Sequence, residues 1–198
     1  MDLAILPLSE HYQGLLSLWV FLGASLLLLF LHLFYRLVPV LARMQRQNKQ
    51  VADSRNVKDS YRITIRNTML YGFLTQLVFF GLMLPFMVTA EPRQWWDILL
   101  DIVILLMFYD FIYYLTHRFL FHDGPLGGPL IAMHAVHHQK KNPCRLDSSY
   151  LHPLEAVIGL ALFAASITVL ALLMGKFHVV TLIVSCAVFI EFNQHNHD

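Results

Sequence analysis

Charged residues are scarce in this sequence. Only 14% of the 198 residues are charged, 57% are hydrophobic, and the mean hydropathy is +0.57. Soluble domains carry roughly 25% charged residues, so a soluble domain of this length could not bury so much apolar surface. The length suits one domain, and the composition predicts an integral membrane protein.

Cysteine and an excess of one charge are also lacking. The net charge is +1, so no strongly basic field predicts nucleic acid as a partner. Cys144 and Cys186 are too few and too far apart for a disulfide framework or a CxxC metal site. Residues 1–10 contain no Lys or Arg, so the basic region of a cleaved signal peptide is missing. This short N-terminus favours the bacterial inner membrane over the endoplasmic reticulum.

Hydrophobic runs, in contrast, are long and numerous. A spanning helix needs about 20 apolar residues, and five stretches reach or approach that length. Short connectors with Pro92 and Gly175 separate the second from the third and the fourth from the fifth. The sequence therefore predicts an all-α, polytopic membrane helix bundle with two helical hairpins. The stretches are 14–34, 69–90, 95–115, 154–174 and 177–193.

The basic residues lie on one side of these stretches. Eight fall within 36–66 and four within 118–145, whereas the opposite side has only Arg93 and Lys176. The positive-inside rule places both basic loops in the cytoplasm and the N-terminus outside. Polar residues 45–56 could form a helix or a loose connector.

Histidine is abundant where the hydrophobic stretches end on that cytoplasmic side. The chain has eleven histidines, six of them within 117–152. On a helix, His134, His137 and His138 share one face, because they stand at i, i+3 and i+4. His117 and His122 are five apart, about 140° around an ideal helix. Either they clasp a centre from two sides or the helix unwinds there.

The histidines indicate a metal site on the cytoplasmic face, since imidazole is the commonest metal ligand. Eight candidates exceed one tetrahedral site and suggest two metals. His152 could instead hydrogen-bond to a ligand or begin a helix before Pro153. The predicted ligands are His117, His122, His134, His137, His138, His152, His195 and His197.

Two carboxylates are candidate catalytic residues beside these ligands. Asp110 stands seven residues before His117, on nearly the same helix face, and Glu155 follows His152. Metal-bound histidines commonly donate their other N–H to a carboxylate, and intramembrane carboxylates are costly unless functional. We expect Asp110 and Glu155 to orient ligands.

At these residues the sequence resembles the fatty acid hydroxylase superfamily, which includes sterol desaturases. The likeness spans about 95–198, and 1–94 would form an N-terminal transmembrane region with a basic cytoplasmic loop. The matching residues are the run 110–118, His122, His134, His137, His138, His152, Pro153, Glu155 and His195.

The resemblance implies a non-haem di-iron centre with two iron ions and dioxygen as oxidant. It also implies an electron-donating reductase partner and a lipid substrate, sterol or fatty acyl, that is hydroxylated or desaturated. By position, His117, His122, His134, His137 and His138 carry over as metal ligands. The family normally has a further His-x-x-His-His box beyond the point matching His195, so we expect the region 95–198 to be truncated at its C-terminal end.

Two other classes stay open. A membrane zinc hydrolase would use histidine and a nearby Glu to activate water, but the chain has no His-Glu-x-x-His. A metal transporter or sensor is the third hypothesis. Transport predicts ligands near the bilayer midplane on broken helices, whereas these histidines follow the ends of hydrophobic runs.

Overall fold

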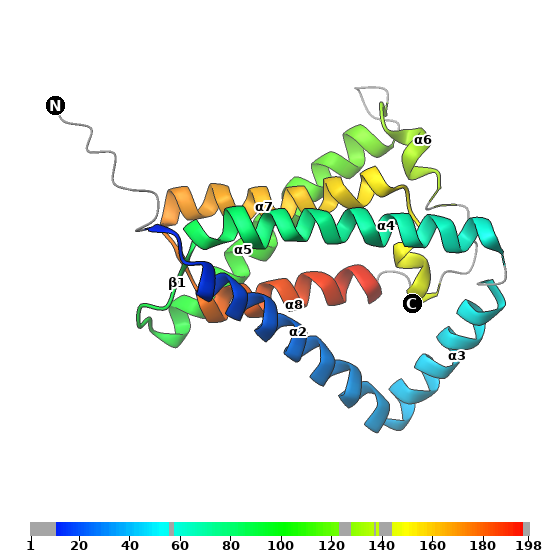
Figure 1. The fold of residues 1–198 in the computed structure, drawn as a ribbon, viewed down its shortest axis with the longest axis horizontal. Coiled ribbons are helices and arrows are strands. Elements are labelled where there is room, and N and C mark those ends of the chain that lie inside the picture. Colours follow the sequence, from blue (N-terminus) through cyan, green and yellow to red (C-terminus); the bar gives the residue numbers. More distant parts are fainter. Residues whose placement is uncertain (1–10, 56–57, 123–127, 137, 139–143, 196–198) are drawn as a thin grey trace.

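The computed structural model describes residues 11–55, 58–122, 128–136, 138 and 144–195. Almost all of the described chain is helical, which confirms the predicted all-α membrane bundle (Figure 1). Within these described ranges, four helices are long and apolar enough to cross a membrane. They cover Gly14–Leu37, Asp59–Phe86, Trp95–Phe121 and Pro153–Met174, and a shorter apolar helix covers Val179–Gln194.

The spanning helices bear the labels of Figure 1 and include short irregular turns. They are α2 (Gly14–Leu37), α4 (Asp59–Val78) with η1 (Phe79–Met83) and η2 (Leu84–Phe86), α5 (Trp95–Thr116) with η3 (His117–Phe121), α7 (Pro153–Met174) and α8 (Val179–His195). The remaining elements are α3 (Pro39–Arg55), α6 (Ile131–His134), η5 (Arg145–Ser149), β1 (Val88–Thr89) and β2 (Phe177–His178).

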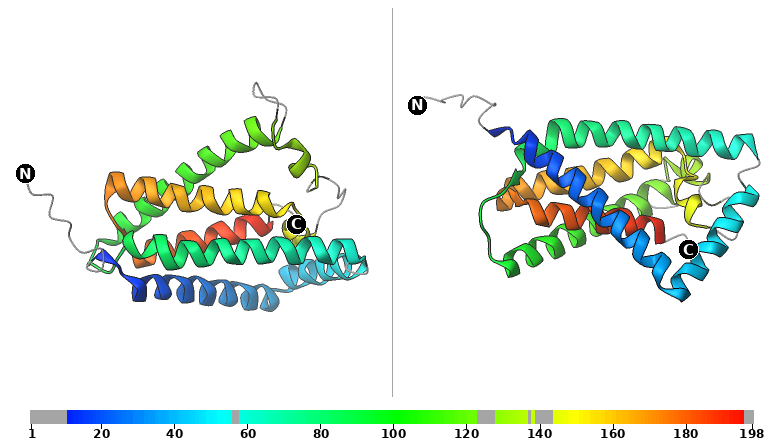
Figure 2. Two further views of the ribbon diagram at one scale, coloured as in Figure 1. Left: turned by 45° about the horizontal axis from the view of Figure 1, so that its top comes forward. Right: turned by 60° about the horizontal axis from the view of Figure 1, so that its bottom comes forward.

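Packing runs between the two predicted hairpins rather than within them. Helix α4 packs on α7, α2 packs on α8, and α5 packs on both α7 and α8. Figures 1 and 2 show α4, α7 and α8 along the same long axis. Their apolar core includes Phe163 and Phe189, which stack with ring centroids 4.2 Å apart, and Tyr109, whose ring meets both edge-on.

The weakly charged end of the bundle is tied by backbone and ion-pair contacts. Strands β1 and β2 pair in parallel, with Val88 opposite Phe177. Arg93 pairs with buried Asp101 at 3.0 Å and donates to the carbonyl of Lys176, also at 3.0 Å. One of the two basic residues expected at this end is thus neutralised by a carboxylate.

A buried carboxylate organises the opposite, basic end. Asp147 of η5 is only 3% exposed and forms an ion pair with Arg55 of α3. Its Oδ1 accepts from the hydroxyl of Tyr61 at 2.7 Å, and its Oδ2 accepts from the backbone N–H of Cys144 at 2.8 Å. Tyr61 also stacks on Tyr150, with centroids 4.9 Å apart. These contacts fasten the segment before α7 to the N-terminal helices.

Candidate metal centre

The end of α5 places the first two histidines. At His117 the helix widens into the π-turn η3, and it ends at His122, whose backbone is extended. A π-turn bonds residue i to i+5, so it turns a side chain five residues on toward the face of the first. The two imidazole centroids are 4.6 Å apart. The helix therefore loses regular α geometry between His117 and His122. This matches the second alternative from the sequence, in which the helix unwinds there.

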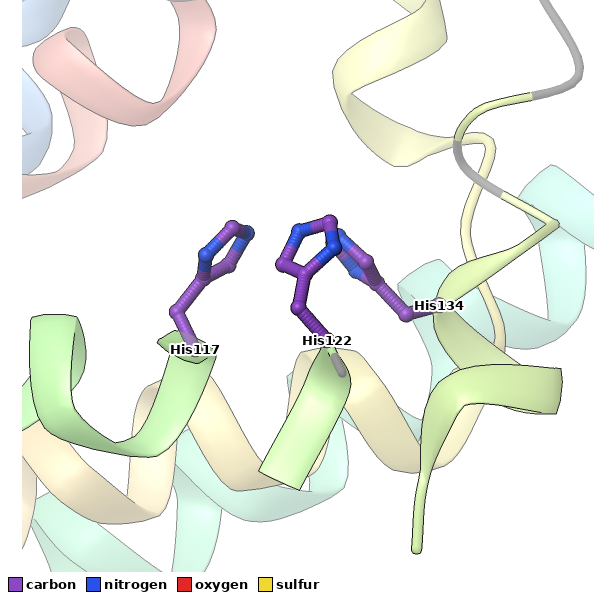
Figure 3. A group of neighbouring side chains, drawn as sticks. All are labelled: His117, His122 and His134. Carbon is purple, nitrogen blue, oxygen red and sulfur yellow. The ribbon is translucent and has the colours of Figure 1, made fainter. Parts of the chain in front are cut away.

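Helix α6 adds His134 to this pair. Its ring lies 4.7 Å from that of His117 and 4.8 Å from that of His122, centroid to centroid. One ring nitrogen from each of the three can be chosen so that all lie within 4.8 Å of one another. Figure 3 shows the rings directed toward a common space, with His117 and His122 coming from the end of the α5–η3 helix and His134 from α6.

His138 extends the cluster from just beyond α6. Its Nε2 is 2.8 Å from Nε2 of His134. Two nitrogens bound at right angles to one metal, each by a bond of about 2.1 Å, stand about 3 Å apart. The two ring nitrogens thus have the spacing of neighbouring ligands. Burial is the main cause that lowers the pKa of His138 below its ordinary value, and the nearby His134 and His122 lower it further. A lowered pKa favours the neutral form of the imidazole, which is the form that binds metal.

Glu155 holds the most buried member of the cluster. The Nδ1 of His134 and the Oε1 of Glu155 are 2.7 Å apart, and the two side chains are only 3% and 8% exposed. When Nδ1 donates its proton to the carboxylate, Nε2 is left unprotonated toward the other histidines. The second oxygen, Oε2, is buried and has no hydrogen-bond partner among the described residues.

Two aromatic side chains pack against the imidazole rings of the cluster. Phe121 is fully buried and stacks on the His134 ring, with centroids 5.2 Å apart and planes at 12°. Tyr113 lies one turn before His117, with its ring 5.8 Å away. These aromatic rings restrict the orientation of the imidazoles and shield the imidazole faces that they contact from water.

Among the described residues, Asp110 and His152 are not brought into this arrangement. Asp110 is exposed on α5, and its side chain forms no hydrogen bond or ion pair with a described residue. His152 begins α7: its Nδ1 accepts from the N–H of Leu154 at 3.2 Å. An accepting Nδ1 leaves the proton of the neutral ring on Nε2, so this geometry matches the helix-start alternative.

Three further predicted ligands lie wholly or partly outside the described residues. His137 and His197 lie outside the described residues. For His195 only the backbone, at the end of α8, is described.

The model of the fatty acid hydroxylase family matches residues 102–198, which include every histidine of this cluster. This C-terminal half of the chain belongs to the fatty acid hydroxylase family. Comparison with curated proteins and with solved structures gave no match.

The donors of this family segment fit a metal ion. Imidazole nitrogens suit iron, zinc, copper and nickel, and four of them converge here with one fixed by a carboxylate. The buried Oε2 of Glu155, which has no partner in the described part of the chain, is a polar atom that a cation or a further ligand would satisfy.

Proposed function

We propose that this chain is a membrane-bound non-haem di-iron oxidoreductase that uses dioxygen to hydroxylate or desaturate a C–H bond of a lipid, sterol or fatty acyl. Two observations support the proposal: the family of residues 102–198, and the convergence of histidines at one end of a membrane bundle. The single observation that carries most weight is the buried His134–Glu155 pair within this cluster. Such a pair is the usual support of a metal ligand.

The residues of the cluster have distinct roles in this proposal. His117, His122, His134 and His138 would hold iron, and His137, His195 and His197 supply the candidate ligands for a second ion. Bound iron supplies activation of dioxygen and cleavage of a strong C–H bond. Glu155 keeps His134 in one tautomer and orientation. Phe121 and Tyr113 exclude water from the imidazoles. Asp110 has no part in it, because its side chain is exposed on α5.

The membrane position defines the expected partners. A lipid would reach the cluster from the bilayer, and a reductase would supply electrons from the side that carries the basic connectors, which the positive-inside rule assigns to the cytoplasm.

Metal content of the purified protein tests the proposal. The protein is extracted in detergent, and iron and zinc per chain are measured by plasma mass spectrometry for the wild type and for His134→Ala. We expect about two irons per chain, lost in the variant, and oxidised lipid products when a reductase is added. One tightly held zinc without iron would contradict the di-iron assignment and favour the hydrolase; flux of metal across vesicles without lipid oxidation would favour the transporter.

A further inference from the structure

A large pocket opens at the basic end of the bundle, separate from the histidine cluster in its lining. Its volume is about 840 Å³, and its walls come from the last turns of α2, from α3, from η5 and from the end of α8. Figure 1 shows α2 and α3 meeting at an angle, with α8 and η5 on the inner side of that angle. None of the four clustered histidines lines it.

One part of the pocket is aliphatic. Leu28 and Leu29 of α2 line it, together with Leu41 and Met44 of α3. Leu28 and Leu29 lie within the membrane-spanning helix Gly14–Leu37, about two turns before its end. A hydrocarbon chain from the bilayer can therefore lie against this wall without leaving an apolar environment.

The other part is cationic. Arg36, Arg46 and Lys49 line the pocket, all three are exposed, and none forms an ion pair with a described residue. The one carboxylate among the described lining residues is Glu191, which pairs with Arg145 at 2.9 Å. Cations that line one pocket attract an anion to it.

A hydrogen-bond donor in the same lining is also without a partner. The amide nitrogen of Gln45 is buried and has no hydrogen-bond partner among the described residues. The great majority of buried hydrogen-bond donors in proteins have an acceptor. The donor stands on α3 directly before Arg46, where an acceptor oxygen would satisfy it.

The depth of these groups matches one kind of ligand. Arg36 lies in the last turn of α2, where the spanning segment ends, so it stands at the level of lipid headgroups; Arg46 and Lys49 line the same pocket from α3. Basic pockets between transmembrane helices at this level bind anionic headgroups. We propose that the pocket binds an anionic phospholipid, with the phosphate between Arg36, Arg46 and Lys49 and an acyl chain along Leu28 and Leu29.

Native mass spectrometry of the full chain in a neutral detergent tests this proposal. The protein is titrated with phosphatidylglycerol and, separately, with phosphatidylcholine of the same acyl chains. The test variant is R46Q/K49Q. The matched control is R43Q/R66Q, which removes the same charge from exposed positions of the same basic region outside the pocket. Near an anionic headgroup each basic residue contributes enough to change affinity about fivefold.

We expect phosphatidylglycerol to bind the wild type more tightly than phosphatidylcholine, and its dissociation constant to rise roughly 30-fold in the test variant. The control variant should match the wild type. Equal weakening in both variants, or equal binding of the two lipids, would overturn the proposal in favour of surface charge or bulk lipid. Displacement of the lipid by millimolar glycerol phosphate would also overturn it, because a soluble phosphate would then suffice. Metal loading takes no part in this readout, so its outcome is independent of the proposed enzyme function.

Discussion

Removing the carboxylate of Glu155 should weaken metal binding without unfolding the bundle. Glu155 accepts from His134 at 2.7 Å, a short bond of the charge-assisted kind, which is roughly twice as strong as a neutral one. Glutamine at this position keeps the size and one carbonyl oxygen but loses the charge. Alanine removes the acceptor of the Nδ1–H of His134 altogether.

The magnitude follows from the position of this bond. Replacing the group that orients a metal-bound histidine typically costs 10- to 100-fold in metal affinity, which is about 1.4 to 2.8 kcal/mol. Because glutamine retains an acceptor, we expect Glu155→Gln near the lower limit. Glu155→Ala should lie near the upper limit, because His134 is only 3% exposed and water cannot replace the lost partner.

Competition with a chelator measures the effect. Iron retained by each variant is followed against increasing chelator concentration, and the thermal midpoint of each apo-protein is measured alongside. Asp101→Asn is the matched control, since Asp101 is also a buried, ion-paired carboxylate but lies at the other end of the bundle. Wild-type iron retention in both Glu155 variants would refute the reasoning, as would an equal loss in Asp101→Asn.

Three further changes should act on stability. Asp147→Ala should lower it by about 3 kcal/mol, because it removes a buried carboxylate that pairs with Arg55 and accepts from the hydroxyl of Tyr61 and the N–H of Cys144; thermal melts in detergent measure this, and an unchanged midpoint would contradict it. Because the fold lowers the pKa of His138, this side chain takes up a proton in the unfolded chain at about pH 6.5 but in the folded chain only at a lower pH. The apo-protein should therefore lose stability as pH falls from 7.5 to 5.5, and His138→Gln should reduce that loss. Gly23→Val should cost about 1–3 kcal/mol, because even a Cβ at Gly23 would stand 2.5 Å from Ile183 of α8; full wild-type stability would show that Ile183 moves aside freely.

The length of the apolar stretches predicted the helices well, because apolar stretches of about 20 residues have few alternatives in a membrane. Which helices pack against each other could not be predicted from the length of the apolar stretches. The packing of α2 on α8 depends on a close approach at Gly23, and such contacts join residues far apart in the sequence. The parallel pairing of β1 with β2 has no signal in strands of two residues.

The histidine spacing gave the right neighbourhood for the cluster but not its geometry. The five-residue interval from His117 to His122 left two arrangements open, and the π-turn that decides between them depends on local backbone bonding. The buried role of Asp147 was not foreseen, since a single carboxylate among Arg145, Leu146 and Ser148 resembles an ordinary polar loop. A buried tyrosine, Tyr61, is what shows otherwise.

The anchoring of Asp147 shows how the two halves of the chain depend on each other. The family match begins at residue 102, yet the segment before α7, which leads to Glu155, is held by Arg55 and Tyr61, which precede that match. Thr68 of α4 adds a hydrogen bond to the carbonyl of Leu151 at 2.7 Å. Glu155 fixes His134 only while α7 begins in the right place. The orientation of a metal ligand therefore rests, through this segment, on helices α3 and α4 outside the matched region.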